Sequence, residues 1–272
     1  MMQGSGFLHV VLCAIFGLIV LFLILPLLFL VPISLTGSQF LEFPPRSFSL
    51  RWYAEFFNNP TWLRATQVSL TVGVGATVLA LVAGTLASVA LVRGRFPGRG
   101  ILTALLIAPL IIPTVIIALA LYMVFLRWRL VDNLLALTLV HALVAMPYVV
   151  LIVSAALRRF DTTLERAARV MGAGPVRAFM SVTLPYLLPA MLAASILAFF
   201  ASFDELIITL FVSGGTETLP VRIWNDLTLR LDPTVPAVSV MLTVLSIGFM
   251  AIGEILRRRH QARYAAGNAT EN

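Results

Sequence analysis

Residues 135–156 read LALTLVHALVAMPYVVLIVSAA, and this stretch decides the class of fold. It lies in a longer run, residues 133–157, that contains no acidic or basic residue. About 20 helical residues cross the roughly 30 Å of hydrocarbon in a bilayer, so the run is long enough to span a membrane. Its polar and apolar residues do not alternate as they would in a strand of a membrane barrel. The stretch therefore predicts a transmembrane α-helix.

Five other runs have the same character, which predicts an all-α integral membrane protein with a bundle of six transmembrane helices. We expect a single domain over residues 1–272, with a cytoplasmic loop at 157–186 and a cytoplasmic tail at 257–272. With 60% hydrophobic and 11% charged residues, the chain cannot be a soluble domain, in which about a quarter of residues are charged. A cleaved signal peptide is disfavoured for the first run, because no basic segment precedes it and no A-x-A site follows. The six spans are predicted at 8–33, 66–92, 101–125, 135–156, 187–212 and 236–256.

The distribution of arginine predicts the orientation, because loops rich in basic residues stay in the cytoplasm. The loops at 93–100 and 157–186 and the tail together contain more arginines than the loops on the opposite side. We therefore expect both termini to be cytoplasmic.

The residue types exclude several kinds of chemistry. All 19 basic residues are arginine, so the chain has no P-loop lysine and no Schiff-base lysine. Cys13 is the only cysteine, and the three histidines are far apart, so neither a zinc cluster nor a protease motif is present. The arginines flank apolar runs, which disfavours nucleic-acid binding. We expect no cofactor and no catalytic residue, and we interpret His141 as a hydrogen-bonded packing residue in preference to a ligand.

An aromatic segment, SFSLRWYAEFF, follows the first span at residues 47–57. Its aromatic residues recur at four-residue spacing, which predicts a short amphipathic helix at the membrane interface. An interfacial anchor is favoured over direct contact with a substrate.

The longest predicted cytoplasmic loop reads RRFDTTLERAARVMGAGPVRAFMSVTLPYLLPA from residue 158. Asp161 or Thr162 can cap a first short helix, Gly172 permits a sharp turn, and Pro175 suits the first position of a second helix. We expect a break at Leu184–Pro185 before the next span. An exposed helix pair with small and apolar residues indicates a binding partner, although it could also pack only on its own bundle.

This loop resembles the EAA loop of permease subunits of ATP-binding-cassette importers. The pattern E-x-A-A-x-x-x-G followed by L-P falls here on Glu165, Ala167, Ala168, Gly172 and Leu184–Pro185. In that family the loop docks on a separate ATPase subunit, and the family's usual glutamate before the alanines falls here on Arg166. The residues that the resemblance implies for ATPase coupling are Glu165, Arg166, Ala167, Ala168, Gly172, Ala173, Phe179 and Pro185.

The resemblance extends from about residue 47 to residue 246. The segment SFDELIITLFVSGG, from residue 202, is similar to permeases of the spermidine/putrescine branch, which also imports opines, γ-aminobutyrate and aminophosphonates. The resemblance implies the MetI-like fold of type I importers, the bacterial inner membrane and a polyamine substrate, with the other solutes of the branch as alternatives. It also implies two ATPase subunits, a second and different permease chain, and a periplasmic solute-binding protein.

Asp204 and Glu205 interrupt the fifth predicted span. An acid inside a membrane helix costs about 2.5–3.5 kcal/mol on insertion scales, so it needs a partner or a wet cavity. One interpretation is that the pair lines the pathway of a cationic solute. The other is a structural salt bridge or cap with Arg127, Arg129 or Arg222.

Two other classes of protein are disfavoured by the sequence. A secondary transporter that works alone should contain inverted repeats, and the sequence contains no internal repeat. A membrane enzyme is disfavoured because no nucleophile–base or metal pattern is present.

Overall fold

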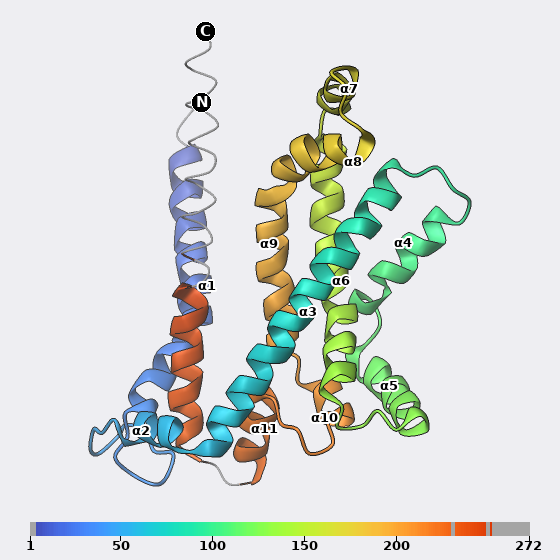
Figure 1. The fold of residues 1–272 in the computed structure, drawn as a ribbon. Coiled ribbons are helices and arrows are strands. Elements are labelled where there is room, and N and C mark those ends of the chain that lie inside the picture. Colours follow the sequence, from blue (N-terminus) through green and yellow to red (C-terminus); the bar gives the residue numbers. More distant parts are fainter. Residues whose placement is uncertain (1–3, 230–231, 249–250, 252–272) are drawn as a thin grey trace. The chain divides into compact units, whose positions relative to one another are not determined.

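The structure is a computed structural model that describes residues 4–229, 232–248 and 251. The secondary-structure elements of these residues are all helices, and their one β-contact is an isolated bridge between Thr36 and Phe48. The chain divides into two compact units, one formed by Met1–Leu63 with Ile223–Gly248 and the other containing Arg64–Arg222. The helices (Figure 1) are α1 Gly4–Ser34, α2 Arg51–Asn58, α3 Pro60–Arg93, α4 Arg99–Ile107, η1 Ala108–Leu110, α5 Thr114–Trp128, α6 Leu134–Arg159, α7 Thr162–Val170, α8 Pro175–Ala178, η2 Phe179–Thr183, α9 Leu184–Phe203, α10 Ile207–Val212, α11 Leu219–Leu229 and an unlabelled helix at Thr234–Gly248.

The first unit contains the predicted interfacial helix, which is α2. Trp52 and Phe56 are buried one turn apart, whereas Phe57 is exposed and Phe48 lies outside the helix. The Trp52 indole N–H donates to the Thr36 carbonyl over 2.9 Å. The aromatic stripe therefore anchors α2 to the chain that follows α1.

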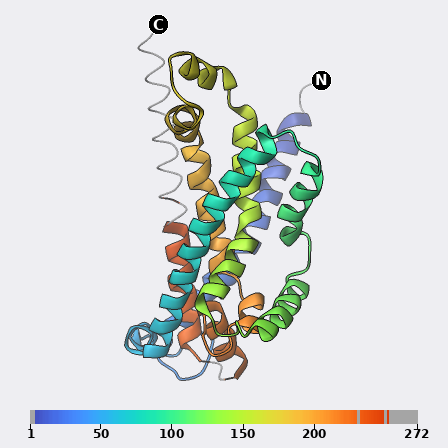
Figure 2. The same ribbon diagram turned by 45° about the vertical axis from the view of Figure 1, so that its right-hand side comes forward.

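The second unit is built around α6, which packs extensively on α9. Figure 2 shows α7 and α8 at one end of this unit and α5 and α10 at the other. One buried cluster joins α3, α6 and α9, and a second joins α3, α5, α6 and α10. Both ends of the unit are thus held by the same pair of helices, α3 and α6.

Helices α3 and α6 approach closely because α3 presents small residues to its neighbour. A Cβ atom at Gly84 would lie 2.8 Å from the Val149 side chain. The Ser88 hydroxyl, one turn further along, donates to the Gly84 carbonyl over 2.7 Å and lies 3.3 Å from the Val150 carbonyl. Small residues that let backbones approach are a common basis of helix packing in membranes.

Four helices are long and apolar enough to cross a membrane, at Leu8–Ser34, Pro60–Arg93, Leu134–Arg159 and Pro175–Phe203. They match four of the six predicted spans, except that the helix predicted at 187–212 ends at Phe203. The span predicted at 101–125 is not one continuous helix: Arg99–Leu110 and Thr114–Trp128 meet at 101°. Proline explains this bend, because Pro113 lacks an N–H donor and drives the preceding residue out of the helical conformation.

Within the described residues, the last predicted span, 236–256, is helical over Thr234–Gly248 and at Ala251. Its remaining residues, apart from Ala251, and the predicted tail at 257–272 lie outside the described residues.

Candidate functional site

The loop between α6 and α9 folds as a short helix, a tight turn and a second helical segment. The Asp161 carboxylate caps α7 by accepting from the Thr163 N–H over 2.9 Å, and hydrogen bonds from Thr163 lower the pKa of this exposed carboxyl group. Gly172 adopts a positive φ of 93°, which L-residues avoid, and Pro175 begins α8. The cap, the turn and the proline position predicted from the sequence are confirmed.

The break predicted at Leu184–Pro185 is wrong. The chain passes from α8 through one π-helical turn, η2, directly into α9, and Pro185 lies in the first turn of that helix. Pro185 has no N–H to donate within this continuous run, and it directly follows the π-helical turn, where the α-helical hydrogen-bond pattern is interrupted. The loop is therefore joined to the long helix that leads to Phe203.

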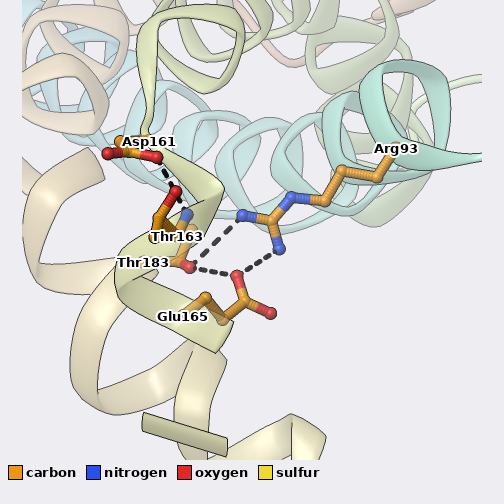
Figure 3. A network of polar contacts seen from close by, with 5 residues as sticks. All are labelled: Arg93, Asp161, Thr163, Glu165 and Thr183. Atoms are coloured by element: carbon orange, nitrogen blue, oxygen red, sulfur yellow. Dashed lines mark hydrogen bonds and ion pairs between the residues drawn. The ribbon is translucent and has the colours of Figure 1, made fainter. Parts of the chain in front are cut away.

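Three polar side chains tie α7 to the rest of the unit (Figure 3). The Arg93 guanidinium, at the end of α3, lies 2.7 Å from a Glu165 carboxylate oxygen. The Thr183 hydroxyl donates to the same oxygen over 2.7 Å, and Arg93 donates to this hydroxyl over 3.3 Å. The side chains of Arg93 and Glu165 are only 26% and 16% exposed, so solvent screens the pair less than a surface pair. We call Arg93, Glu165 and Thr183 the loop anchor.

Aromatic rings enclose the guanidinium of the loop anchor. The Arg93 Cζ atom lies 5.6 Å from the centre of the Phe160 ring and 5.9 Å from that of Phe179. Arginine interacts favourably with ring faces at such distances. The Phe160 ring in turn packs edge-on against Tyr186. Arg93 thus joins α3 to α7, η2 and Phe160, and Phe160 connects it to α9.

Other side chains of the loop are exposed and have no partner within the described residues. Val170 is 88% exposed and Met171 84%, and Leu164, Val176 and Met180 are also exposed. Arg166, Arg169 and Arg177 are exposed beside them. Clustered exposed apolar side chains of this kind mark interaction surfaces. We call these eight residues the loop surface.

A shallow open pocket of about 450 Å³ lies beside the turn. Its lining is mostly small side chains, with one arginine, and it combines residues of α7 with residues of the second helical segment. The lining residues are Ala168, Met171, Gly172, Ala173, Arg177, Ser181 and Val182.

The acidic pair lies where the fifth predicted span breaks. Helix α9 ends at Phe203, Asp204 is its C-cap, and α10 begins at Ile207. A Glu205 carboxylate oxygen accepts from the Ile208 N–H over 2.9 Å and so caps α10. Asp204 is exposed, and its carboxylate makes no hydrogen bond or ion pair within the described part of the chain. The predicted salt bridge or cap with Arg127, Arg129 or Arg222 is absent there, and the Glu205 carboxylate instead bonds to the backbone of α10.

His141 on α6 is buried beside this break. Its Nδ1 atom lies 2.9 Å from the Ser202 hydroxyl and 3.1 Å from the Ser202 carbonyl oxygen, and its Nε2 atom lies 2.9 Å from the Thr209 hydroxyl. The predicted hydrogen-bonded packing role of His141 is confirmed.

The structure places the predicted coupling residues differently. Glu165 faces inward and Phe179 contacts its arginine partner, whereas Arg166, Ala167 and Gly172 are exposed. Ala168 and Ala173 line the pocket, and Pro185 lies in the first turn of α9. Sequence reasoning missed Arg93 and Thr183 as partners of Glu165. The position of Arg93 at the end of a long apolar run was visible, but it was used only to predict orientation.

Comparison with known proteins places these features in a family. Residues 76–265 match the family model described as binding-protein-dependent transport system inner membrane component. The chain is 34% identical to the putrescine transport system permease protein PotI of Escherichia coli K12, over 85% of each chain. It is 30% identical to the spermidine/putrescine transport system permease protein PotC of Haemophilus influenzae, over 88% of this chain and 93% of that protein.

The fold is similar to that of chains in two crystal structures of bacterial importers. A chain of an ABC transporter involved in the import of the acidic polysaccharide alginate aligns with a TM-score of 0.72 and 15% identity, covering 93% of this chain and 98% of that chain. A chain of the alginate transporter in complex with an alginate-bound periplasmic protein aligns with a TM-score of 0.69 and 13% identity, covering 94% and 95%. The family model spans most of this chain and two of its relatives are permeases. The chain therefore belongs to the inner-membrane components of binding-protein-dependent transport systems, the multi-pass permease subunits of ABC importers, and it is not an enzyme.

Proposed function

We propose that the loop surface is the site at which an ABC ATPase subunit docks. The observation that carries this proposal is the contrast between the two sides of α7. One side is held by the loop anchor, and the other exposes Val170 and Met171 almost completely. Such an arrangement suits a rigid lever: a partner pushes on the exposed side, and the anchor passes the displacement to α3 and α9.

Arg166, which stands where the family usually has a glutamate, is available to contact the ATPase. Glu165 is occupied by Arg93, so the polar contacts to an ATPase fall to the exposed arginines 166, 169 and 177. Arginine offers several donors in a fixed planar group and suits carboxylate partners. We therefore expect acidic side chains on the facing surface of the ATPase.

The remaining partners follow from the family. We propose that two ATPase subunits, a second and different permease chain and a periplasmic binding protein complete the importer, with this chain lining half of the pathway. A relative of known fold was crystallised with its periplasmic protein, which supports that partner. The arginine distribution supports a cytoplasmic position for both termini and for the loop surface.

We propose a polyamine, putrescine or spermidine, as the solute. PotI and PotC, which transport these solutes, align over most of this chain. The exposed and unpaired carboxylate of Asp204 could replace water around a primary ammonium group, while Glu205 shapes the same break by capping α10. Opines, γ-aminobutyrate and aminophosphonates are the competing solutes.

Two measurements test this function. The chain purified in mild detergent from its native host should retain an ATPase subunit, and cells that express the importer should take up labelled putrescine or spermidine in preference to γ-aminobutyrate. Labelling of a cysteine introduced at Arg166 by an impermeant reagent from outside intact cells would contradict the docking proposal. Uptake of γ-aminobutyrate alone would contradict the polyamine proposal.

A further inference from the structure

The break between α9 and α10 is held from one side by a single residue of another helix. His141 contacts Ser202, two residues before Asp204, and Thr209, five residues after it. The imidazole is 1% exposed, Ser202 is 3% and Thr209 is fully buried. Each ring nitrogen is therefore committed to a different helix, and the residues between them form the break.

The hydrogen bonds continue from the imidazole to the backbone of the acidic pair. The Thr209 hydroxyl lies 2.9 Å from Nε2 and 3.1 Å from the Glu205 carbonyl oxygen. In one tautomer Nε2 donates to Thr209 and Nδ1 accepts from the Ser202 hydroxyl. In the other, Nδ1 donates to the Ser202 carbonyl oxygen and Nε2 accepts from Thr209. Both ring nitrogens are used in either tautomer.

We propose that His141 is a positioning residue that clamps the two ends of the broken helix and thereby fixes the exposure of Asp204. Buried polar groups without partners are costly in an apolar surrounding, so the three side chains hold each other in place. Opening the break would separate Ser202 from Thr209 and would leave at least one ring nitrogen unsatisfied. The transport consequence of the clamp rests on the proposed role of Asp204 in the pathway, whereas its geometric consequence does not.

The test measures the geometry of the break directly. In the assembled importer, Cys13→Ser removes the native thiol of this chain and Asp204→Cys introduces one reporter. The rate of reaction of this thiol with an impermeant maleimide, followed on this chain by mass, reports the exposure of the break. Adding His141→Phe, which keeps the ring volume but not the nitrogens, should change the rate about two- to tenfold, the range that corresponds to the net contribution of one or two hydrogen bonds.

Partial variants separate the two arms of the clamp. Asparagine places an amide near the position of Nδ1 and glutamine near that of Nε2, so His141→Asn and His141→Gln should each give smaller changes than His141→Phe. Ser202→Ala combined with His141→Phe should give no more than His141→Phe alone, because within the described residues the Ser202 hydroxyl bonds to this ring alone and both changes remove that bond. Should His141→Phe prevent insertion, Ser202→Ala and Thr209→Val carry the test alone.

Ser154→Ala is the matched control, since it deletes a buried hydroxyl from the same helix without touching the break. An unchanged labelling rate in His141→Phe, or additive effects of His141→Phe and Ser202→Ala, would overturn the clamp. Uptake is measured separately with Asp204 intact. Altered labelling with normal uptake would support the clamp and refute the pathway role of Asp204. Unaltered labelling, with uptake lost in Asp204→Asn, would refute the clamp alone.

Discussion

An acidic side chain lies beside each end of α9, and the two differ in their partners. Near its start, Glu165 is paired with Arg93 and Thr183, and the chain continues into α9 without a break. At its end, Asp204 has no described partner and the helix stops. A 20-residue helix such as α9 is about 30 Å long, which separates the two acids by roughly the thickness of a membrane core.

This difference indicates that the two acids have different roles, one in mechanical coupling and the other in binding of the solute. A paired acid fixes one element to another, so its loss should affect mechanical coupling. An unpaired acid keeps its capacity to bind a cation, so its loss should affect the solute. The predictions below test whether the two ends can be separated in this way.

The largest effect is expected for Arg93→Ala. Removal of the guanidinium leaves the half-buried Glu165 carboxylate without its charged partner, and we expect the loop to lose about 2–3 kcal/mol of local stability. ATPase retention in detergent and solute-dependent ATP hydrolysis should both fall. Arg95→Ala is the control, because it removes an exposed arginine two residues after Arg93, between α3 and α4. If Arg93→Ala keeps full coupling, the anchor has no mechanical role.

Gly172→Val should have the next largest effect. No atom lies within 4 Å of a Cβ at this position, so the penalty comes only from the positive φ of 93° and is about 1–2 kcal/mol. We expect weaker retention of the ATPase subunit. Gly174→Ala is the control: its Cβ also meets nothing within 4 Å, but its φ is −63°, so retention should be unchanged. Equal retention in both variants would show that the turn is not needed for docking.

Asp204→Asn should act at the other end of the helix. Loss of one charged hydrogen bond to an ammonium group should raise KM for putrescine about tenfold, while basal ATP hydrolysis and retention of the ATPase remain normal. Glu205→Gln keeps an acceptor for the Ile208 N–H and should affect uptake less. A result in which Asp204→Asn uncouples ATP hydrolysis would remove the distinction between the two ends.

The smallest effect concerns the cap of α7. Hydrogen bonds from Thr163 lower the pKa of Asp161 in the folded chain, so the stabilisation is complete above the unfolded value of about 3.9 and is lost as the pH falls through the lower folded value. Amide hydrogen exchange over 162–170 should therefore speed up only at pH values below about 4. Asp161→Asn retains a capping acceptor that does not titrate, so it should lose this pH dependence. Identical pH profiles for the two proteins would exclude Asp161 as the cause.

Much of the fold and part of the site could be predicted from the sequence. Uncharged runs indicate helices because backbone polar groups must be satisfied within a membrane, and Gly172 and Pro175 act through local backbone conformation. The bend after Leu110 was missed because proline is tolerated in many membrane helices, as at Pro147 in α6. Whether a proline bends a helix depends on the neighbours that satisfy the freed carbonyl groups.

The partners of the acidic residues could not be predicted. Arg93 lies 72 positions before Glu165, and His141 lies 61 and 68 positions before Ser202 and Thr209. No periodic pattern links residues at such separations, since they meet only when α3, α6 and α9 pack.

The sequence by itself determined that this is a helical membrane protein, that its longest predicted cytoplasmic loop contains a glycine turn, and that two acids lie inside an apolar segment. These features follow from local rules of hydrophobicity, helix capping and backbone conformation. Only the tertiary structure decided that Glu165 is paired with Arg93 and that the Asp204 carboxylate has no described partner. It also decided that His141 spans the break between α9 and α10. The physical reason is that the pairing of a charge depends on which helices lie beside it, and that arrangement is fixed by the packing of small and apolar side chains throughout the unit.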